Sequence, residues 1–129
     1  MNTQNTIVLL VEDDRNLREV VSLVLTDEGY TVLQADNGQS ALDLLNNLKS
    51  HQKPHCVVLD LQMPVMSGNE FLEAIEKTYQ DKFGDIPVII CSAEGQLKDH
   101  HQVVARLEKP VSLDLLCTTI NLFSENLRT

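Results

Sequence analysis

The sequence has no tryptophan, only 4% aromatic residues and just three cysteines among its 129 residues. Cys56, Cys91 and Cys117 are odd in number and far apart, with no Cys-x-x-Cys pair. This pattern excludes a disulfide framework and a zinc ribbon, which need paired or closer cysteines. We therefore expect buried, reduced thiols, as in a cytoplasmic protein.

Basic residues are also scarce, because 10 Lys and Arg stand against 19 Asp and Glu, for a formal net charge of −9. Nucleic acids and anionic membrane surfaces attract basic faces, so we expect neither as a direct partner. No apolar run approaches the roughly 18 residues of a membrane span. The first residues lack the basic segment of a signal peptide, so none is expected.

Short β-rich runs alternate with helical patterns along the whole chain, and no linker or repeat interrupts them. We expect strands at residues 7–11, 30–35, 55–60, 86–91 and 104–108. The first helical stripe consists of Leu17, Val20, Val21, Val24 and Leu25. Strict alternation predicts an α/β fold with a five-stranded parallel sheet and helices on both faces. The length suits one domain, expected over residues 1–129 with about 6–127 structured.

Polar residues follow the predicted strands where each one ends. Glu12 and Asp13 follow the first strand, and Asp60 ends the third. Ser92 follows the fourth, and Lys109 the fifth. Ligands of such sheets bind beyond the carboxyl ends of the strands, so these side chains should meet at one edge. Neighbouring carboxylates resist joint ionisation, so the acids either point into water or hold a cation.

Four fragments stand at these strand ends in a fixed order: "VLLVEDD", "VVLDLQMPVMSG", "VIICSAEG" and "LEKPV". In this respect the chain resembles the receiver domain of bacterial two-component response regulators, over essentially its whole length. The resemblance implies a flavodoxin-like, doubly wound sheet with strand order 2-1-3-4-5. It also implies that Asp60 accepts a phosphoryl group. Glu12, Asp13, Asp60 and the backbone carbonyl of Gln62 would hold Mg²⁺, or alternatively Mn²⁺.

The chemistry of these residue types agrees with the resemblance. An aspartate attacks a phosphoryl group only if a cation neutralises their mutual repulsion, and a divalent metal does so. Mg²⁺ prefers carboxylate and water ligands. Lys109 and Ser92 would contact the phosphoryl oxygens, with Ser92 as the switch hydroxyl. In the family the bond between this lysine and the following proline, here Pro110, is usually cis.

The function implied is a signalling switch that is not a turnover enzyme. It would take a phosphoryl group from the phosphohistidine of a histidine kinase or phosphotransfer protein. Its change of shape would then alter the binding of an effector protein, which the sequence does not identify. The chain could be a stand-alone receiver or part of a larger protein, and both possibilities stay open.

The sequence departs from the family in two places. An aromatic residue is usual three positions before the lysine, where this chain has Arg106. We expect Arg106 to pair with an acid in one state of the switch. The segment between Ser92 and Lys109 is short, with a weak helical stripe of Leu97, His101 and Val104. This predicts a short or irregular fourth helix.

Two polar residues are expected to set the lifetime of the phosphorylated form. They are Gln62, two positions after the acceptor, and Glu94, two positions after the switch hydroxyl. Both could position an attacking water, which favours fast loss of the phosphoryl group. The four histidines, by contrast, have spacings that do not suggest a metal site, and we expect them to be solvated. They are His51, His55, His100 and His101.

Other functions remain to be weighed. A pseudo-receiver would bind partners without phosphorylation, but this chain retains the acids, the acceptor and the lysine. A haloacid-dehalogenase-like phosphatase uses similar groups, but it has its nucleophile on the first strand and its acidic pair late in the chain. A flavodoxin-like FMN carrier needs a phosphate-binding first loop, and "EDDRN" would repel a phosphate.

Overall fold

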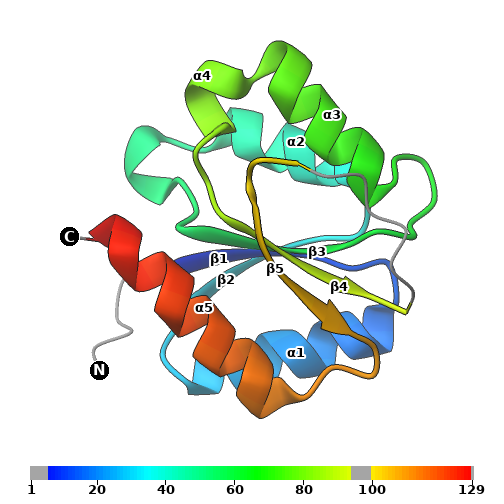
Figure 1. Ribbon diagram of the computed structural model, residues 1–129, viewed down its shortest axis with the longest axis vertical. Coiled ribbons are helices and arrows are strands. Elements are labelled where there is room, and N and C mark those ends of the chain that lie inside the picture. Colours follow the sequence, from blue (N-terminus) through cyan, green and yellow to red (C-terminus); the bar gives the residue numbers. More distant parts are fainter. Residues whose placement is uncertain (1–5, 94–99, 129) are drawn as a thin grey trace.

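A computed structural model describes residues 6–93 and 100–128, and it has one five-stranded parallel sheet with the order β2-β1-β3-β4-β5 (Figure 1). The strands are β1 (Ile7–Val11), β2 (Thr31–Ala35), β3 (Cys56–Asp60), β4 (Val88–Ser92) and β5 (Val103–Glu108). The helices are α1 (Arg15–Asp27), α2 (Gly38–Asn47), the 3₁₀ turn η1 (Ser50–Gln52), α3 (Gly68–Thr78), α4 (Gln80–Phe83) and α5 (Leu113–Arg128). The predicted flavodoxin-like topology is confirmed.

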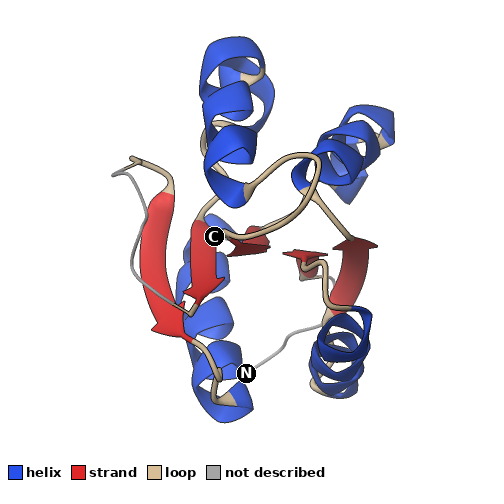
Figure 2. Ribbon diagram, turned by 90° about the vertical axis from the view of Figure 1, so that its right-hand side faces the viewer, coloured by secondary structure: helices blue, strands red, loops and turns tan. Residues whose placement is uncertain are grey.

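The sheet lies between two helical layers (Figures 1 and 2). Helices α1 and α5 cover one face, and α2, α3 and α4 cover the other. Each face has its own apolar core, because every residue of β3 and β4 is buried and their side chains alternate between the two faces. Phe71 of α3 is fully buried in one core, and Ile120 of α5 in the other.

Polar caps begin the three helices that follow β1, β2 and β3. The carboxylate of Asp14 accepts the backbone N–H of Leu17, 3.1 Å away, and so begins α1. The side chain of Asn37 begins α2 in the same way, and Ser67 begins α3 in a capping box. Within α1 the predicted apolar stripe is wrong at Val20, which is 51% exposed, whereas Val21 and Leu25 are buried.

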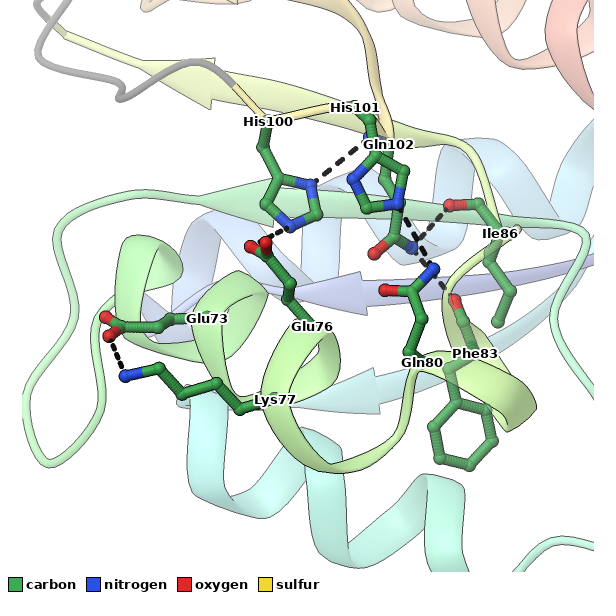
Figure 3. Close-up of polar contacts among 9 residues, drawn as sticks. All are labelled: Glu73, Glu76, Lys77, Gln80, Phe83, Ile86, His100, His101 and Gln102. Atoms are coloured by element: carbon green, nitrogen blue, oxygen red, sulfur yellow. Dashed lines mark hydrogen bonds and ion pairs between the residues drawn. The ribbon is translucent and has the colours of Figure 1, made fainter.

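Of the connection between β4 and β5, the structure describes only Ala93 and residues 100–102, so Leu97 and Glu94 lie outside the described residues. Val104 belongs to β5, which agrees with the strand predicted at residues 104–108 and not with the helical stripe predicted through the same residue. The buried side-chain amide of Gln102 donates to the carbonyls of Phe83 (2.8 Å) and Ile86 (3.0 Å) (Figure 3). The sheet ladder begins at the same residue, since the Val88 N–H donates to the Gln102 carbonyl. These hydrogen bonds hold the backbone in an extended conformation from Gln102 onward. The short helix α4 precedes β4 and was not predicted.

Two histidines are less exposed than the solvated side chains that the sequence predicted. The His100 side chain is only 8% exposed and faces Glu76 of α3 (Figure 3). Its Nδ1 accepts the Gln102 N–H at 3.2 Å, and its ring stacks on His101. His55 is half-buried, and its Nδ1 accepts the Ile7 N–H at 3.0 Å. His51 and His101 are exposed, as expected.

Cys56 and Cys91 are buried free thiols, and Cys117 is half-buried. Burial raises the pKa of both buried thiols to about 12, so they are protonated at neutral pH and poor nucleophiles. Within the described part of the chain, no helix is both long enough and apolar enough to span a membrane.

Candidate functional site

Three carboxylates meet at the carboxyl edge of the sheet. Glu12 and Asp13 follow β1 directly, and Asp60 is the last residue of β3, the neighbouring strand. Each offers one oxygen atom such that all three atoms lie within 4.8 Å of one another. Among the described residues, no other such group of acidic, histidine or cysteine side chains occurs. This oxygen-rich donor set suits a hard divalent cation such as Mg²⁺.

Lys109 joins two of these carboxylates. Its Nζ lies 2.8 Å from Glu12 Oε1 and 3.3 Å from Asp60 Oδ2. The backbone N–H of Lys109 donates to the carbonyl of Ser92 at the end of β4 (2.9 Å), and the Lys109–Pro110 peptide bond is cis, as the resemblance implies. The ammonium of Lys109 thus contacts two of the three acids, and one positive charge against three carboxylates leaves an excess of negative charge at this edge.

Glu12 is 5% exposed, which is unusual for a carboxylate. Burial raises its pKa, and the nearby charge of Asp60 adds to that rise. Hydrogen bonds from Lys109 and from the backbone N–H of Asp14 (3.1 Å) act in the opposite direction without cancelling it. A further cation at this edge would relieve the cost of the buried negative charge.

Asp60 is also 5% exposed, and its Oδ1 accepts the backbone N–H of Gln62 at 3.2 Å. The start of α3 presses against the same residue. A Cβ atom on Gly68 would lie 2.5 Å from the Asp60 carbonyl oxygen, so only glycine fits here. The Gly68 N–H donates to the Leu61 carbonyl (3.0 Å), which holds the helix beside the acceptor.

The structure thus brings together four of the predicted residues: Glu12, Asp13, Asp60 and Lys109. Ser92 is buried at the end of β4, one position beyond Cys91, which pairs with Asp60 in the sheet register. Its place is compatible with the predicted role, which stays a prediction, as does the metal contact of the Gln62 carbonyl.

Two of the predicted tuning residues have exposed positions, and a third is not described. The side chain of Gln62 is exposed, and Arg106 is exposed on β5. Glu94 falls outside the described residues. One supporting residue was missed: Arg18 of α1 donates from Nη1 to the Glu12 carbonyl (2.8 Å). Every residue has a backbone carbonyl, so no sequence pattern indicates which one a side chain contacts.

The family model described as the response regulator receiver domain matches residues 8–121. The chain belongs to the receiver domain family. The haloacid-dehalogenase-like phosphatase considered above is therefore wrong. Receiver domains are signalling domains of two-component systems and not turnover enzymes.

Curated relatives extend this receiver match to longer proteins. Response regulator RR06 of Streptococcus pneumoniae is 37% identical over 118 residues, covering 88% of this chain and 50% of the relative. Transcriptional regulatory protein GlrR of Escherichia coli is 35% identical over 119 residues, covering 88% of this chain and 25% of GlrR. The chain therefore spans half or less of the length of these two relatives.

Solved receiver structures have the same fold. The chemotaxis response regulator CheY4 of Vibrio cholerae has a TM-score of 0.74 at 28% identity, covering 92% of this chain and 98% of CheY4. TrrA of Thermotoga maritima, solved in complex with Mg²⁺-BeF, has a TM-score of 0.75 at 26% identity, with the same coverage of both chains. The similarity therefore extends over almost the whole length of both solved chains.

Proposed function

We propose that this receiver is an active phospho-acceptor, in which Asp60 takes a phosphoryl group from a phosphohistidine donor. The observation that supports this is the meeting of Glu12, Asp13 and Asp60 with the single ammonium of Lys109. Glu12 and Asp60 are buried, whereas Asp13 is exposed. Burying two acids with one ammonium costs folding free energy, and this arrangement has a purpose if the site holds a metal and a phosphoryl group.

The proposed step is a direct transfer. A carboxylate oxygen of Asp60 attacks phosphorus, the P–N bond of the donor breaks, and its electron pair returns to the imidazole nitrogen. An acyl phosphate on Asp60 results. Mg²⁺, or Mn²⁺, held by Glu12, Asp13, Asp60 and the Gln62 carbonyl, would neutralise charge between carboxylate and phosphoryl oxygens. The Mg²⁺-BeF complex of TrrA supports this choice of metal.

The other predicted residues act after the new bond forms. Lys109 contacts Asp60 already and can follow the charge onto a phosphoryl oxygen. The Ser92 hydroxyl would donate a hydrogen bond to another oxygen. Its movement would pull on the β4–β5 connection, and so change the surface that an effector protein recognises. We propose Ser92, Arg106, Gln62 and Glu94 as the residues that set this switch and its lifetime.

The partners proposed are a histidine kinase or a histidine phosphotransfer protein as donor, and an effector protein as receiver of the signal. One relative is the hybrid signal transduction histidine kinase I of Dictyostelium discoideum, at 29% identity over 120 residues. The buried reduced thiols fit an exchange in the cytoplasm. We also propose that the whole chain forms one receiver domain.

Intact-mass spectrometry after incubation with acetyl phosphate and Mg²⁺ tests the proposal. The wild-type protein should gain the mass of one phosphoryl group, and Asp60→Asn should gain nothing. Asp43→Asn, at an exposed position of α2, is the matched control and should be phosphorylated like the wild type. An unchanged mass of the wild-type protein would favour the pseudo-receiver, which binds partners without phosphorylation.

A further inference from the structure

A cavity of about 430 Å³ opens beside the site, between the sheet and the two helices α1 and α5. Its walls are apolar. Leu10 and Val58 come from the sheet, Leu17 and Val21 from α1, and Leu116 from α5. The volume is in the range of small-molecule sites, which combine apolar walls with a few converging polar groups. Phosphoryl transfer at Asp60 makes no use of this apolar space.

One end of the cavity is polar and carries a net negative charge. The residues there are Glu12, Asp60 and Lys109, so two carboxylates face one ammonium. Both carboxylates are 5% exposed, and they are therefore poorly hydrated. An anionic ligand would add to the excess negative charge, and a neutral one would leave it uncompensated. A ligand with a cationic head would relieve it.

We propose that this cavity binds a small hydrophobic amine. Its ammonium group donates hydrogen bonds to the carboxylates of Glu12 and Asp60, beside Lys109. Its alkyl or aryl body packs between Leu17 and Val21 of α1 and Leu116 of α5. The amine shares two carboxylates with the metal of the proposed function. Amine and Mg²⁺ therefore exclude each other, and this last statement alone rests on the proposed function.

The test uses three probes of one shape: 2-phenylethylamine, 2-phenylethanol and 3-phenylpropanoate. Each is titrated into metal-free protein without a phosphoryl donor, and the methyl NMR signals of Leu17, Val21 and Leu116 are followed. The amine should give saturable shifts with a Kd of about 1 mM or less. It should bind about tenfold tighter than the alcohol, with the carboxylate weakest. Absence of saturable shifts, or equal binding of amine and alcohol, overturns the proposal.

Three variants, one of them a control, test whether the amine binds in the cavity. Val111 is half-buried at its rim, so Val111→Phe should fill it and weaken amine binding at least about tenfold. Val104→Phe adds the same ring at a partly exposed position of β5, outside the cavity, and should leave amine binding unchanged. Glu12→Gln should reduce amine binding to the level of the alcohol. Unchanged amine binding in Val111→Phe would contradict the proposal.

Competition with Mg²⁺ separates this proposal from the proposed function. In the wild type, Mg²⁺ should weaken amine binding in proportion to its concentration. Asp13 does not line the cavity, so Asp13→Asn should abolish the competition and retain amine binding. Amine binding that Mg²⁺ never weakens would support the cavity site and count against the metal site of the proposed function.

Discussion

Lys109 allows two buried carboxylates to coexist at the carboxyl edge of the sheet. Its ammonium lies within 3.3 Å of both Glu12 and Asp60, and its side chain is only 24% exposed. Breaking such a partly buried pair leaves the acids without their cation, which costs more than losing a surface ion pair.

We therefore expect Lys109→Met to lower the free energy of unfolding by about 2 kcal/mol at pH 7 without metal. The pKa of Glu12 in the folded protein lies above its ordinary value of 4.5, so ionising this residue costs stability as the pH rises through that range. The deficit of Lys109→Met should thus shrink toward pH 4, where Glu12 is protonated.

Urea denaturation at several pH values measures this deficit. Lys77→Met removes an exposed lysine that pairs with Glu73 and should change nothing measurable. Equal stability of Lys109→Met and wild type at every pH would show that the buried pair contributes nothing.

Asp13 gives a direct test of metal binding, because its side chain is exposed and removing its charge should therefore cost little stability without metal. We expect Mg²⁺ at ten times its Kd to stabilise the wild type by about 1.4 kcal/mol. Asp13→Asn should abolish this gain and leave the metal-free stability unchanged. Asp14→Asn is the adjacent control, since asparagine still caps α1. Thermal denaturation with and without Mg²⁺ measures the stability of the wild type and of each variant. A full stabilisation of Asp13→Asn by Mg²⁺ would contradict the proposed set of metal ligands.

The sequence predicts these charged residues well, for a physical reason. Parallel strands end at one edge of a sheet, so residues that follow the strands converge whatever their separation along the chain. Burial is harder to predict. His100 is buried because residue 102 is tied to Phe83 and Ile86, and no local pattern reveals that contact.

At the end of the β4–β5 connection, two predictions overlap at Val104, which belongs both to the predicted strand 104–108 and to the predicted helical stripe of Leu97, His101 and Val104. The structure bears out the strand, because Val104 lies in β5, where the burial of side chains alternates along the strand. Alternation over six residues and a helical stripe share several positions, so a short segment of this kind is ambiguous from sequence. The long apolar strands have no such ambiguity.

His100 should make this connection sensitive to pH. Burial lowers its pKa below 6.5, and the stacked His101 adds to the effect, whereas Glu76 at 3.5 Å partly offsets it. The neutral ring contributes stability that is fully present above pH 6.5. This contribution is lost as the pH falls through 6.5 toward the lower pKa of the folded protein, because the unfolded chain binds the proton more readily.

The variant His100→Asn isolates this effect. Its side-chain oxygen can still accept the Gln102 N–H but does not titrate, so stability should change less between pH 7 and pH 5 than in the wild type. His51→Asn, at an exposed position, should retain the pH dependence of the wild type. Chemical denaturation at both pH values measures the difference. Identical pH dependence in His100→Asn and wild type would rule out His100 as its source.

For the molecule as a whole, the sheet order and the two helical layers position one acidic edge, and the rest of the chain supports it. Helix α1 contributes Arg18 behind Glu12, α3 presses Gly68 against Asp60, and β4 holds Lys109 through Ser92. RR06 and GlrR are about two and four times as long as the region that each shares with this chain. The receiver region is therefore shared by proteins of different total length.

The central claim is that this edge makes Asp60 the phosphoryl acceptor. The most direct measurement treats the protein with acetyl phosphate and Mg²⁺, reduces the acyl phosphate with borohydride, and locates the reduced carboxyl group by peptide mass spectrometry. We predict reduction at Asp60 alone, dependent on Mg²⁺ and absent in Asp13→Asn. Reduction at another carboxylate, or at none, would contradict the account.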